Sequence, residues 1–259
     1  MLGLGLSNTV GEFSENLTHN QGSLNFDGSN DYVQIDNLTS LLSANWGSGT
    51  AKNVEFSISA WIRAETMATT GVVFNARVGT STENHIILLW HGSGNSMRFT
   101  SKFNNTAVTT KDGDDFTIMG TGAENNGSWY HVLGTISKSN SLQEFWINGT
   151  KVSSKTMNNQ IQGAIDGMNI GTNTQESNFW NGDIDELAVW NRKLTDDEIS
   201  IISNARDKHI DLQGQVGDEL IGYYRFEEKS GSTAVNSAFN NTGTDGTLVN
   251  SPTYTTNIA

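Results

Sequence analysis

Carboxylates and histidines are the side chains of this sequence that are suited to hydrolytic or metal chemistry, and their spacing does not favour either. A retaining glycosidase needs two carboxyl groups about 5–5.5 Å apart. Residues 112–115 form an acidic turn broken by glycine, and Glu227 and Glu228 would point to opposite faces of a strand. The histidines, which are His19, His85, His91, His131 and His209, show no spacing typical of metal ligands. The sequence therefore predicts that the protein is not an enzyme.

Exposed aromatic rings are the other feature of the sequence that could bind a ligand, because sugar sites combine such rings with polar side chains. Trp46, Trp90 and Trp180 fall in predicted loops or at strand ends and are candidates to bind a ligand. The alternative is that each of them packs in the core or at a sheet edge. Four further tryptophans fall inside predicted strands and are expected in the core: Trp61, Trp129, Trp146 and Trp190.

Composition and charge exclude several classes of protein. The chain has 259 residues, no cysteine, and 28 acidic against 15 basic residues, which gives a formal net charge of −13. Without cysteine, disulfides and thiolate metal sites are excluded. The negative charge repels phosphate backbones and anionic lipids, so no nucleic-acid partner is expected. The apolar runs are far shorter than the roughly 20 residues of a transmembrane helix, so no membrane insertion is expected.

The beginning of the sequence is predicted to lie outside the folded domain. Residues 1–20 are polar, contain glycine and lack strong periodicity, which indicates an arm. This segment also lacks the basic and apolar regions of a signal peptide. The remainder, residues 21–259, is predicted to form a single domain.

Short alternating runs separated by glycine-rich turns dominate that domain. Such runs cover residues 23–26, 32–35, 56–63, 71–78, 85–91, 97–103, 129–137 and 143–147. Asn148-Gly149 is the dipeptide preferred in a type I′ hairpin, and a return strand begins at Lys151. The spacing predicts an all-β antiparallel sandwich or barrel rather than βαβ units.

One amphipathic helix interrupts the strands, over residues 195–208. Thr195 and Glu198 have the spacing of a capping box. Ile199 and Ile202 continue an apolar stripe along one face. We expect this helix to cover an edge or an open end of the sandwich.

Three groups of segments carry a resemblance to a known family. They are LNFDGSNDYV (24–33) with FSISAWI (56–62), WYHV (129–132) with FWING (145–149), and FWNGDIDELAVWNRKLT (179–195). In this order, over residues 22–205, the chain resembles the LamG-like jelly-roll family of the concanavalin A-like lectin/glucanase superfamily. The resemblance implies an antiparallel β-sandwich of jelly-roll type, and it implies little about activity because one fold serves many functions.

A structural Ca²⁺ ion is also implied by the resemblance. Asp185 matches the position that supplies a carboxylate, and the turn at Asp27 and Gly28 would add backbone oxygens. Ca²⁺ prefers six to eight oxygen ligands, so such a set is chemically suitable. The alternative is that Asp183 and Asp185 share one strand face and are solvated or bonded to the backbone.

The last part of the sequence departs from the order usual in the family. Residues 220–228 and 245–250 resemble the stretch that normally precedes the Asp27-Gly28 segment. A circular permutation, in which strands from residues 220–259 complete the same sandwich, is one explanation. The other is donation of a strand to a neighbouring subunit.

Two functions from different classes are therefore expected. The first is a non-enzymatic structural or attachment protein of a virus particle, such as a phage capsid decoration, tail or fibre component. With residues 220–228 and 245–250 as its last segments, the chain resembles stand-alone marine phage virion proteins of this fold, which implies such a role. Its partners would be other virion proteins, copies of itself and surface glycans, and it would be located on the virion. The alternative is a calcium-dependent carbohydrate-binding or adhesion module of a secreted or cell-surface bacterial protein.

Overall fold

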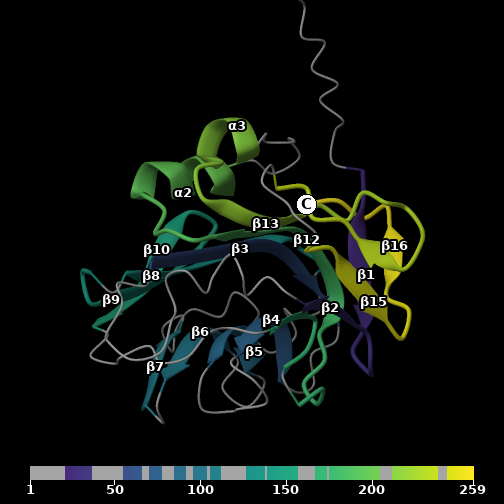
Figure 1. Cartoon of the computed structure of the whole chain (residues 1–259). Helices are drawn as coiled ribbons and strands as arrows, with labels where there is room; N and C mark the ends of the chain where they lie inside the picture. Colours follow the sequence, from purple (N-terminus) through teal and green to yellow (C-terminus); the bar gives the residue numbers. More distant parts are fainter. Residues whose placement is uncertain are drawn as a thin grey trace, which may run out of the picture.

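Two antiparallel β-sheets lie face to face in the computed structural model of the chain (Figure 1). Among the described residues, the first sheet, sheet A, has the strand order β10-β9-β8-β3-β12-β1-β16, and β13 also pairs with β12. The second, sheet B, has the order β14-β15-β2-β11-β4-β5-β6-β7. This arrangement confirms the predicted antiparallel sandwich.

The structure describes residues 21–36, 55–65, 70–77, 85–91, 96–103, 106–111, 127–137, 139–156, 167–173, 175–204, 212–238 and 244–259. The strands are β1 (Ser23–Asp27), β2 (Tyr32–Asp36), β3 (Glu55–Ala64), β4 (Gly71–Arg77), β5 (His85–His91), β6 (Ser96–Phe103), β7 (Thr106–Lys111), β8 (Tyr130–Ser137), β9 (Leu142–Ile147), β10 (Thr150–Thr156), β11 (Gly167–Ile170), β12 (Asn181–Trp190), β13 (Leu220–Tyr224), β14 (Thr233–Ala234), β15 (Gly246–Val249) and β16 (Thr253–Thr255). The helices are α2 (Asp196–Ser203) and α3 (Leu212–Val216). The predicted arm over residues 1–20 lies outside the described residues.

The main core lies between the two sheets. Its largest side chains come from both sheets and include Phe26, Phe56, Phe74, Phe99 and Phe145, all fully buried. Because alternate strand residues point to opposite faces, the same strands also present a second set of side chains outward. For sheet A, this outer face is itself covered.

The capping box predicted at the start of the helix is confirmed. The Glu198 backbone N–H donates to the Thr195 hydroxyl, and the Glu198 carboxylate accepts from the Thr195 backbone N–H at 2.8 Å. The helix ends at Ser203 rather than at residue 208. A second short helix, α3, was not predicted, because its five residues carry no clear cap or periodicity.

Both helices lie on the outer face of sheet A (Figure 1). Trp190 and Leu133 of the sheet pack against Ile199 of α2 and Val216 of α3. The Trp190 indole N–H donates to the Val216 carbonyl at 2.8 Å, so a buried polar group is satisfied. No helix in the part of the chain that the structure describes has the length and apolarity needed to cross a membrane.

The last described strands join both sheets. β16 pairs with β1 and β13 with β12 in sheet A, whereas β15 pairs with β2 in sheet B. Segments from the beginning and the end of the described chain therefore lie side by side (Figure 1).

His131 joins α2 to sheet A and gives a first testable prediction. The Ser203 hydroxyl donates to the Ile199 carbonyl at 2.6 Å, so the His131 Nδ1–H must donate to Ser203 Oγ, 3.1 Å away. Complete burial lowers the pKa of His131 to about 3. We expect an NMR titration of its ring to show the neutral Nδ1–H tautomer from pH 7 down to pH 5. The urea-unfolded chain is the control, in which histidine titrates near pH 6.5. An imidazolium signal from the folded protein at pH 6 would contradict the assignment.

Candidate functional site

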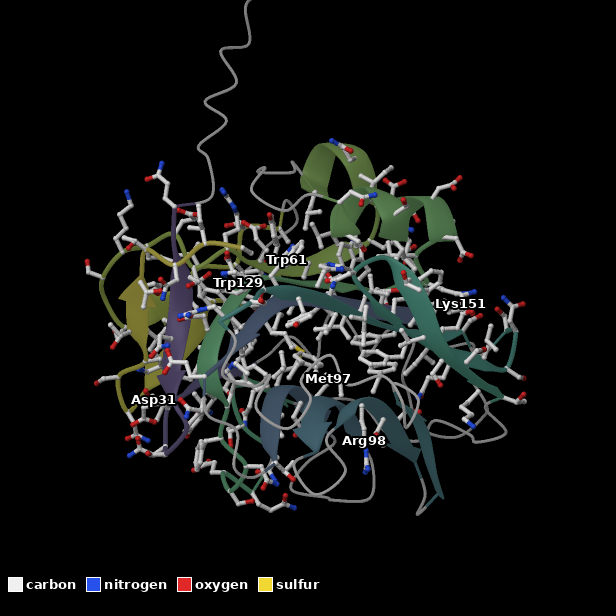
Figure 2. The ribbon with its side chains drawn as sticks, turned by 180° about the vertical axis from the view of Figure 1, so that it is seen from behind. Asp31, Trp61, Met97, Arg98, Trp129 and Lys151 are labelled. Carbon is white, nitrogen blue, oxygen red and sulfur yellow. The ribbon has the colours of Figure 1, made fainter. Side chains whose placement is uncertain are left out.

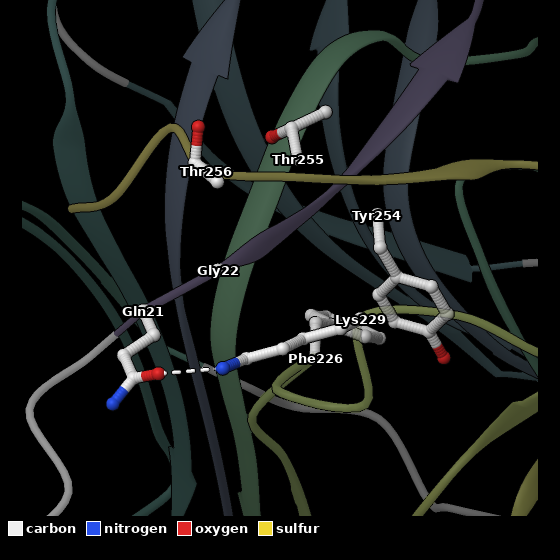
Figure 3. Close-up of a pocket in the computed structure, with 7 residues that line it drawn as sticks. All are labelled: Gln21, Gly22, Phe226, Lys229, Tyr254, Thr255 and Thr256. Carbon is white, nitrogen blue, oxygen red and sulfur yellow. Dashed lines mark hydrogen bonds between the residues drawn. The ribbon is translucent and has the colours of Figure 1, made fainter.

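A pocket of about 280 Å³ opens where β1 and β16 meet the segment that follows β13 (Figure 3). Its lining residues come from three parts of the chain: Gln21, Gly22, Phe226, Lys229, Tyr254, Thr255 and Thr256. The pairing of β1 with β16 brings residues 21–22 and residues 254–256 together, since Ser23 lies opposite Thr255. The segment after β13 then closes the third side.

Tyr254 gives the pocket an aromatic wall. Its side chain is partly buried, and its hydroxyl donates to the Thr233 carbonyl at 2.6 Å. Burial, together with the nearby Glu228, raises the pKa of Tyr254 well above its usual range, so the phenol stays neutral. The hydrogen bond fixes the ring, which faces the pocket (Figure 3).

The opposite side of the pocket is polar. Lys229 Nζ donates to Gln21 Oε1 at 2.7 Å, and the Gln21 backbone N–H donates to Glu227 Oε1 at 2.8 Å. Both Gln21 and Lys229 are exposed, so their remaining donors are accessible from solvent. An aromatic wall facing amide and ammonium donors is an arrangement suited to a polyhydroxylated ligand.

The backbone around the pocket departs from ordinary geometry at two residues. Phe226 and Lys229 have φ values of 55° and 64°, in the left-handed region that non-glycine residues rarely adopt. Such conformations cost free energy and are frequent at sites that clamp ligands. Phe226 is nearly fully buried, and this burial holds the segment in place.

Sequence reasoning missed this pocket. Gln21 and Lys229 are 208 positions apart, and of the lining residues only Phe226 falls within a segment that the sequence analysis singled out. The one available signal was the resemblance of residues 220–228 to a segment that precedes the Asp27-Gly28 turn, because it implies that these distant segments are neighbours.

The three tryptophans predicted to bind a ligand have different locations. Trp180 is fully buried in the core between the sheets, so it does not offer a ring to a ligand. Its position before β12 is a strand end, as expected, but its neighbours there are core residues. Trp90 lies in β5 opposite Met97, and its side chain is not among those described. Trp46 lies outside the described residues.

The residues predicted to bind calcium do not come together. Asp27 lies opposite Asn181 at the start of β12, whereas Asp185 is four residues further along that strand. At the rise of an extended strand this separates them by about 13 Å. A group of three or more His, Asp or Glu side chains able to hold a metal is absent from the described residues. The Ca²⁺ ion stays a prediction, but these residues do not form one site for it.

Each of these residues also has a structural role. The Asp27 carboxylate accepts from the backbone N–H groups of Ser29 and Asn30 at 2.8 and 3.3 Å, which closes the turn. Gly28 has a φ of 74°, and a Cβ there would lie 2.7 Å from the Asn181 Cβ, so the turn requires glycine. Asp185 is fully buried and accepts from the backbone N–H of Glu186 at 2.8 Å.

Comparison with protein families identifies the fold. Residues 27–200, more than half of the chain, match the family model of the concanavalin A-like lectin/glucanases superfamily. The chain belongs to this superfamily. The resemblance noted in the sequence is therefore confirmed, while a search of curated proteins gave no match.

Solved structures of the superfamily share the architecture at low sequence identity. A candidate carbohydrate binding protein from Bacteroides ovatus is 17% identical with a TM-score of 0.62, over 92% of this chain and 60% of that one. The chain thus spans 60% of the length of that protein. The CBM40 of the Ruminococcus gnavus IT-sialidase is 11% identical with a TM-score of 0.54, over 70% of this chain and 96% of that one.

Enzymes also contain this architecture. A mutant of NanB sialidase from Streptococcus pneumoniae matches with 17% identity and a TM-score of 0.53, over 71% of this chain and 28% of that one. At these identities the matches establish a lectin-like fold, and function must be argued from the site.

Proposed function

We propose that this chain is a non-catalytic carbohydrate-binding module, and that the pocket between β1, β16 and the segment after β13 holds one sugar ring. The observation that carries the proposal is the position of the half-buried Tyr254 ring opposite the exposed donors of Gln21 and Lys229. The fold shared with a carbohydrate-binding module, the CBM40 of a sialidase, supports it.

The pocket matches the two faces of a sugar. The C–H groups of a pyranose ring would pack on the Tyr254 ring, while its hydroxyls would accept from Lys229 and exchange hydrogen bonds with the Gln21 amide. The formal net charge of −13 disfavours polyanionic glycans. We therefore expect a neutral sugar.

The composition of the pocket supports binding without catalysis. Glycoside hydrolysis requires a pair of carboxyl groups beside the scissile bond. The described lining residues are Gln, Gly, Phe, Lys, Tyr and Thr, and none of them carries a carboxylate.

A glycan array with two variants at one position tests the proposal. Tyr254→Ala removes the ring, and we expect it to weaken binding of the best neutral glycan at least tenfold, which corresponds to about 1.4 kcal/mol. Tyr254→Phe is the matched control, because it keeps the ring and loses only the hydroxyl that bonds Thr233. It should retain binding.

Thermal melts must show that both variants are folded, since Tyr254 also packs against the core. Should folded Tyr254→Ala bind glycans as tightly as the unaltered chain, the pocket is not the sugar site. If the unaltered chain binds no glycan on the array, the function itself is contradicted.

Whether the module is part of a virus particle or of a secreted bacterial protein is a separate proposal. Attachment to a virus particle is supported by the resemblance of the segments at 220–228 and 245–250 to those of stand-alone virion proteins. Secretion by a bacterium is the alternative. Finding the chain in purified virus particles by mass spectrometry would support the first, and finding it within a longer secreted polypeptide would contradict it.

A further inference from the structure

The polar wall of the pocket at Tyr254, formed by Gln21 and Lys229, has more hydrogen-bond donors than acceptors. Lys229 Nζ donates to Gln21 Oε1 at 2.7 Å, and an ammonium group has further N–H bonds but no lone pair with which to accept. The amide group of Gln21 contributes its own N–H bonds, while its oxygen already accepts from Lys229. A ligand group that faces this wall must therefore accept hydrogen bonds.

The ammonium group of Lys229 bonds to a neutral amide rather than to a carboxylate. Lys151 and Lys193, by contrast, both bond to the buried Glu144 carboxylate at 2.7 Å. Figure 2 shows Lys151 on β10, which is the edge of sheet A opposite to β16 and the pocket. Lys229 can therefore form a charge-assisted hydrogen bond with a ligand, and such bonds are roughly twice as strong as neutral ones.

Two carboxylates beside the pocket disfavour an acidic ligand group. Glu227 accepts from a backbone N–H of the polar wall at 2.8 Å and is 4.0 Å from the Arg225 guanidinium. Glu228 lies near the Tyr254 phenol, whose pKa is raised by burial and by this carboxylate. A ligand carboxylate that reached Lys229 would also approach these two like charges. The acceptor that suits the wall is therefore neutral.

A carbonyl oxygen matches a wall of donors better than a hydroxyl does. A hydroxyl can accept from Lys229, but its own proton then needs an acceptor, and this wall offers few. An amide carbonyl accepts without carrying a proton, and its second lone pair remains for Gln21 or water. In neutral sugars, the acetamido substituent provides such a carbonyl.

The N–H of an acetamido group also has a partner in the pocket. The C=O and N–H bonds of a trans amide point in opposite directions. With the carbonyl toward Lys229, the N–H points to the other side of Gly22, where Figure 3 shows Thr256. Thr256 is exposed, and its hydroxyl can accept a hydrogen bond. Both polar ends of the acetamido group would thus be satisfied.

We propose that the pocket at Tyr254 is specific for an N-acetylhexosamine, and that Lys229 recognises the acetamido carbonyl. This inference rests on the proposed function, because it names the class of sugar for the same pocket. The pyranose ring packs on Tyr254, the carbonyl accepts from Lys229, and the N–H donates to Thr256. A hexose with a hydroxyl in place of the acetamido group brings a proton to the donor wall and binds less tightly.

The first test compares sugars on the unaltered full chain by calorimetry. The methyl glycosides of N-acetylglucosamine and N-acetylgalactosamine are paired with those of glucose and galactose, and glucuronic acid is the acidic probe. We expect the N-acetylated sugar of at least one pair to bind at least tenfold more tightly than its parent hexose. If the parent hexoses or glucuronic acid bind as tightly as the N-acetylated sugars, the inference is overturned. This comparison needs no variant, so it does not depend on the folding of one.

Two variants assign the preference to Lys229. Lys229→Met keeps the length of the side chain and removes the donor, so the affinity ratio between the N-acetylated and the parent sugar should fall to about one. Lys229→Arg is the matched control, because it keeps a positive charge with N–H donors, and it should show a preference again. An unchanged preference in Lys229→Met, with a thermal melt showing that the variant is folded, overturns the role of Lys229.

The results distinguish this inference from the proposed function. If both sugars of each pair bind equally and Tyr254→Ala loses both, the specificity for N-acetylhexosamines is contradicted while the sugar site stands. If no probe and no glycan on the array binds, the proposed function is contradicted and this inference with it.

Discussion

Replacing Arg63 with alanine is expected to lower the free energy of unfolding by about 3–5 kcal/mol. The variant leaves the Asp183 carboxylate fully buried without the guanidinium that contacts it through two nitrogens. Two amide donors remain, from Asn25 at 3.0 Å and Asn257 at 3.4 Å, but neither carries a charge. An unpaired buried charge is among the most destabilising changes in a protein. Urea unfolding at pH 7 measures the effect.

The double variant Arg63→Ala with Asp183→Asn is the control for this first prediction. It removes both charges, so a large part of the lost stability should return. A single variant that loses less than about 1 kcal/mol, as an exposed ion pair does, would show that the pair acts as a surface salt bridge.

Glu186→Gln is expected to remove a loss of stability that the unaltered chain suffers between about pH 4.5 and pH 7. Glu186 lies at a bulge of β12 with a φ of 48°, and its carboxylate contacts the Tyr223 hydroxyl and Arg225 Nε. Burial raises the pKa of Glu186 from 4.5 to about 7, despite the lowering effect of these two partners. Glutamine is neutral at every pH and resembles the protonated acid.

The direction in which stability changes with pH follows from proton binding. In this pH window the unfolded state has released the Glu186 proton while the folded state still holds it, so rising pH favours unfolding. The stability of the unaltered chain relative to Glu186→Gln should fall by on the order of 3 kcal/mol across the window and then level off. The difference between the two chains is the quantity to measure, because burial of His131 changes stability in the opposite direction over much of the same range.

Glu198 is a control for the Glu186 prediction, because its titration changes the stability of the protein with pH in the opposite direction. The hydrogen bond from Arg192 lowers the pKa of Glu198 to about 2, so its charge stabilises the folded state above pH 4.5. That contribution is lost as pH falls toward 2. Parallel pH profiles for the unaltered chain and Glu186→Gln would contradict the second prediction.

Local features of the fold could be predicted from sequence because neighbouring residues determine them. Thr195 and Glu198 form their capping box within one turn, and Asn148 and Gly149 both have the positive φ of a type I′ turn, 47° and 74°. Strand β11 was not predicted, since GMNI is too short to show a period. α3 was missed for the same reason.

The candidate site depends on contacts that no local pattern encodes. The register between β1 and β12 places Asp27 and Asp185 apart from each other. The sequence shows only that Asp27 is in a turn and Asp185 in a strand, and neither pattern encodes that register. Trp180 follows a loop, which suggested exposure, but the crossing from β11 to β12 directs it into the core. The pocket at Tyr254 needed the pairing of β1 with β16, whose residues Ser23 and Thr255 are 232 positions apart.

That pairing has a consequence for how the protein is made. β1 and β2 are synthesised early, and their partners β16 and β15 emerge from the ribosome more than 200 residues later, as Ser23 and Thr255 illustrate. At about 5–20 residues per second this interval is roughly ten to fifty seconds. During it, one edge strand of each sheet exposes unpaired backbone groups that are able to pair with another nascent chain. Production in cells should therefore depend on translation speed and on chaperones that shield nascent chains.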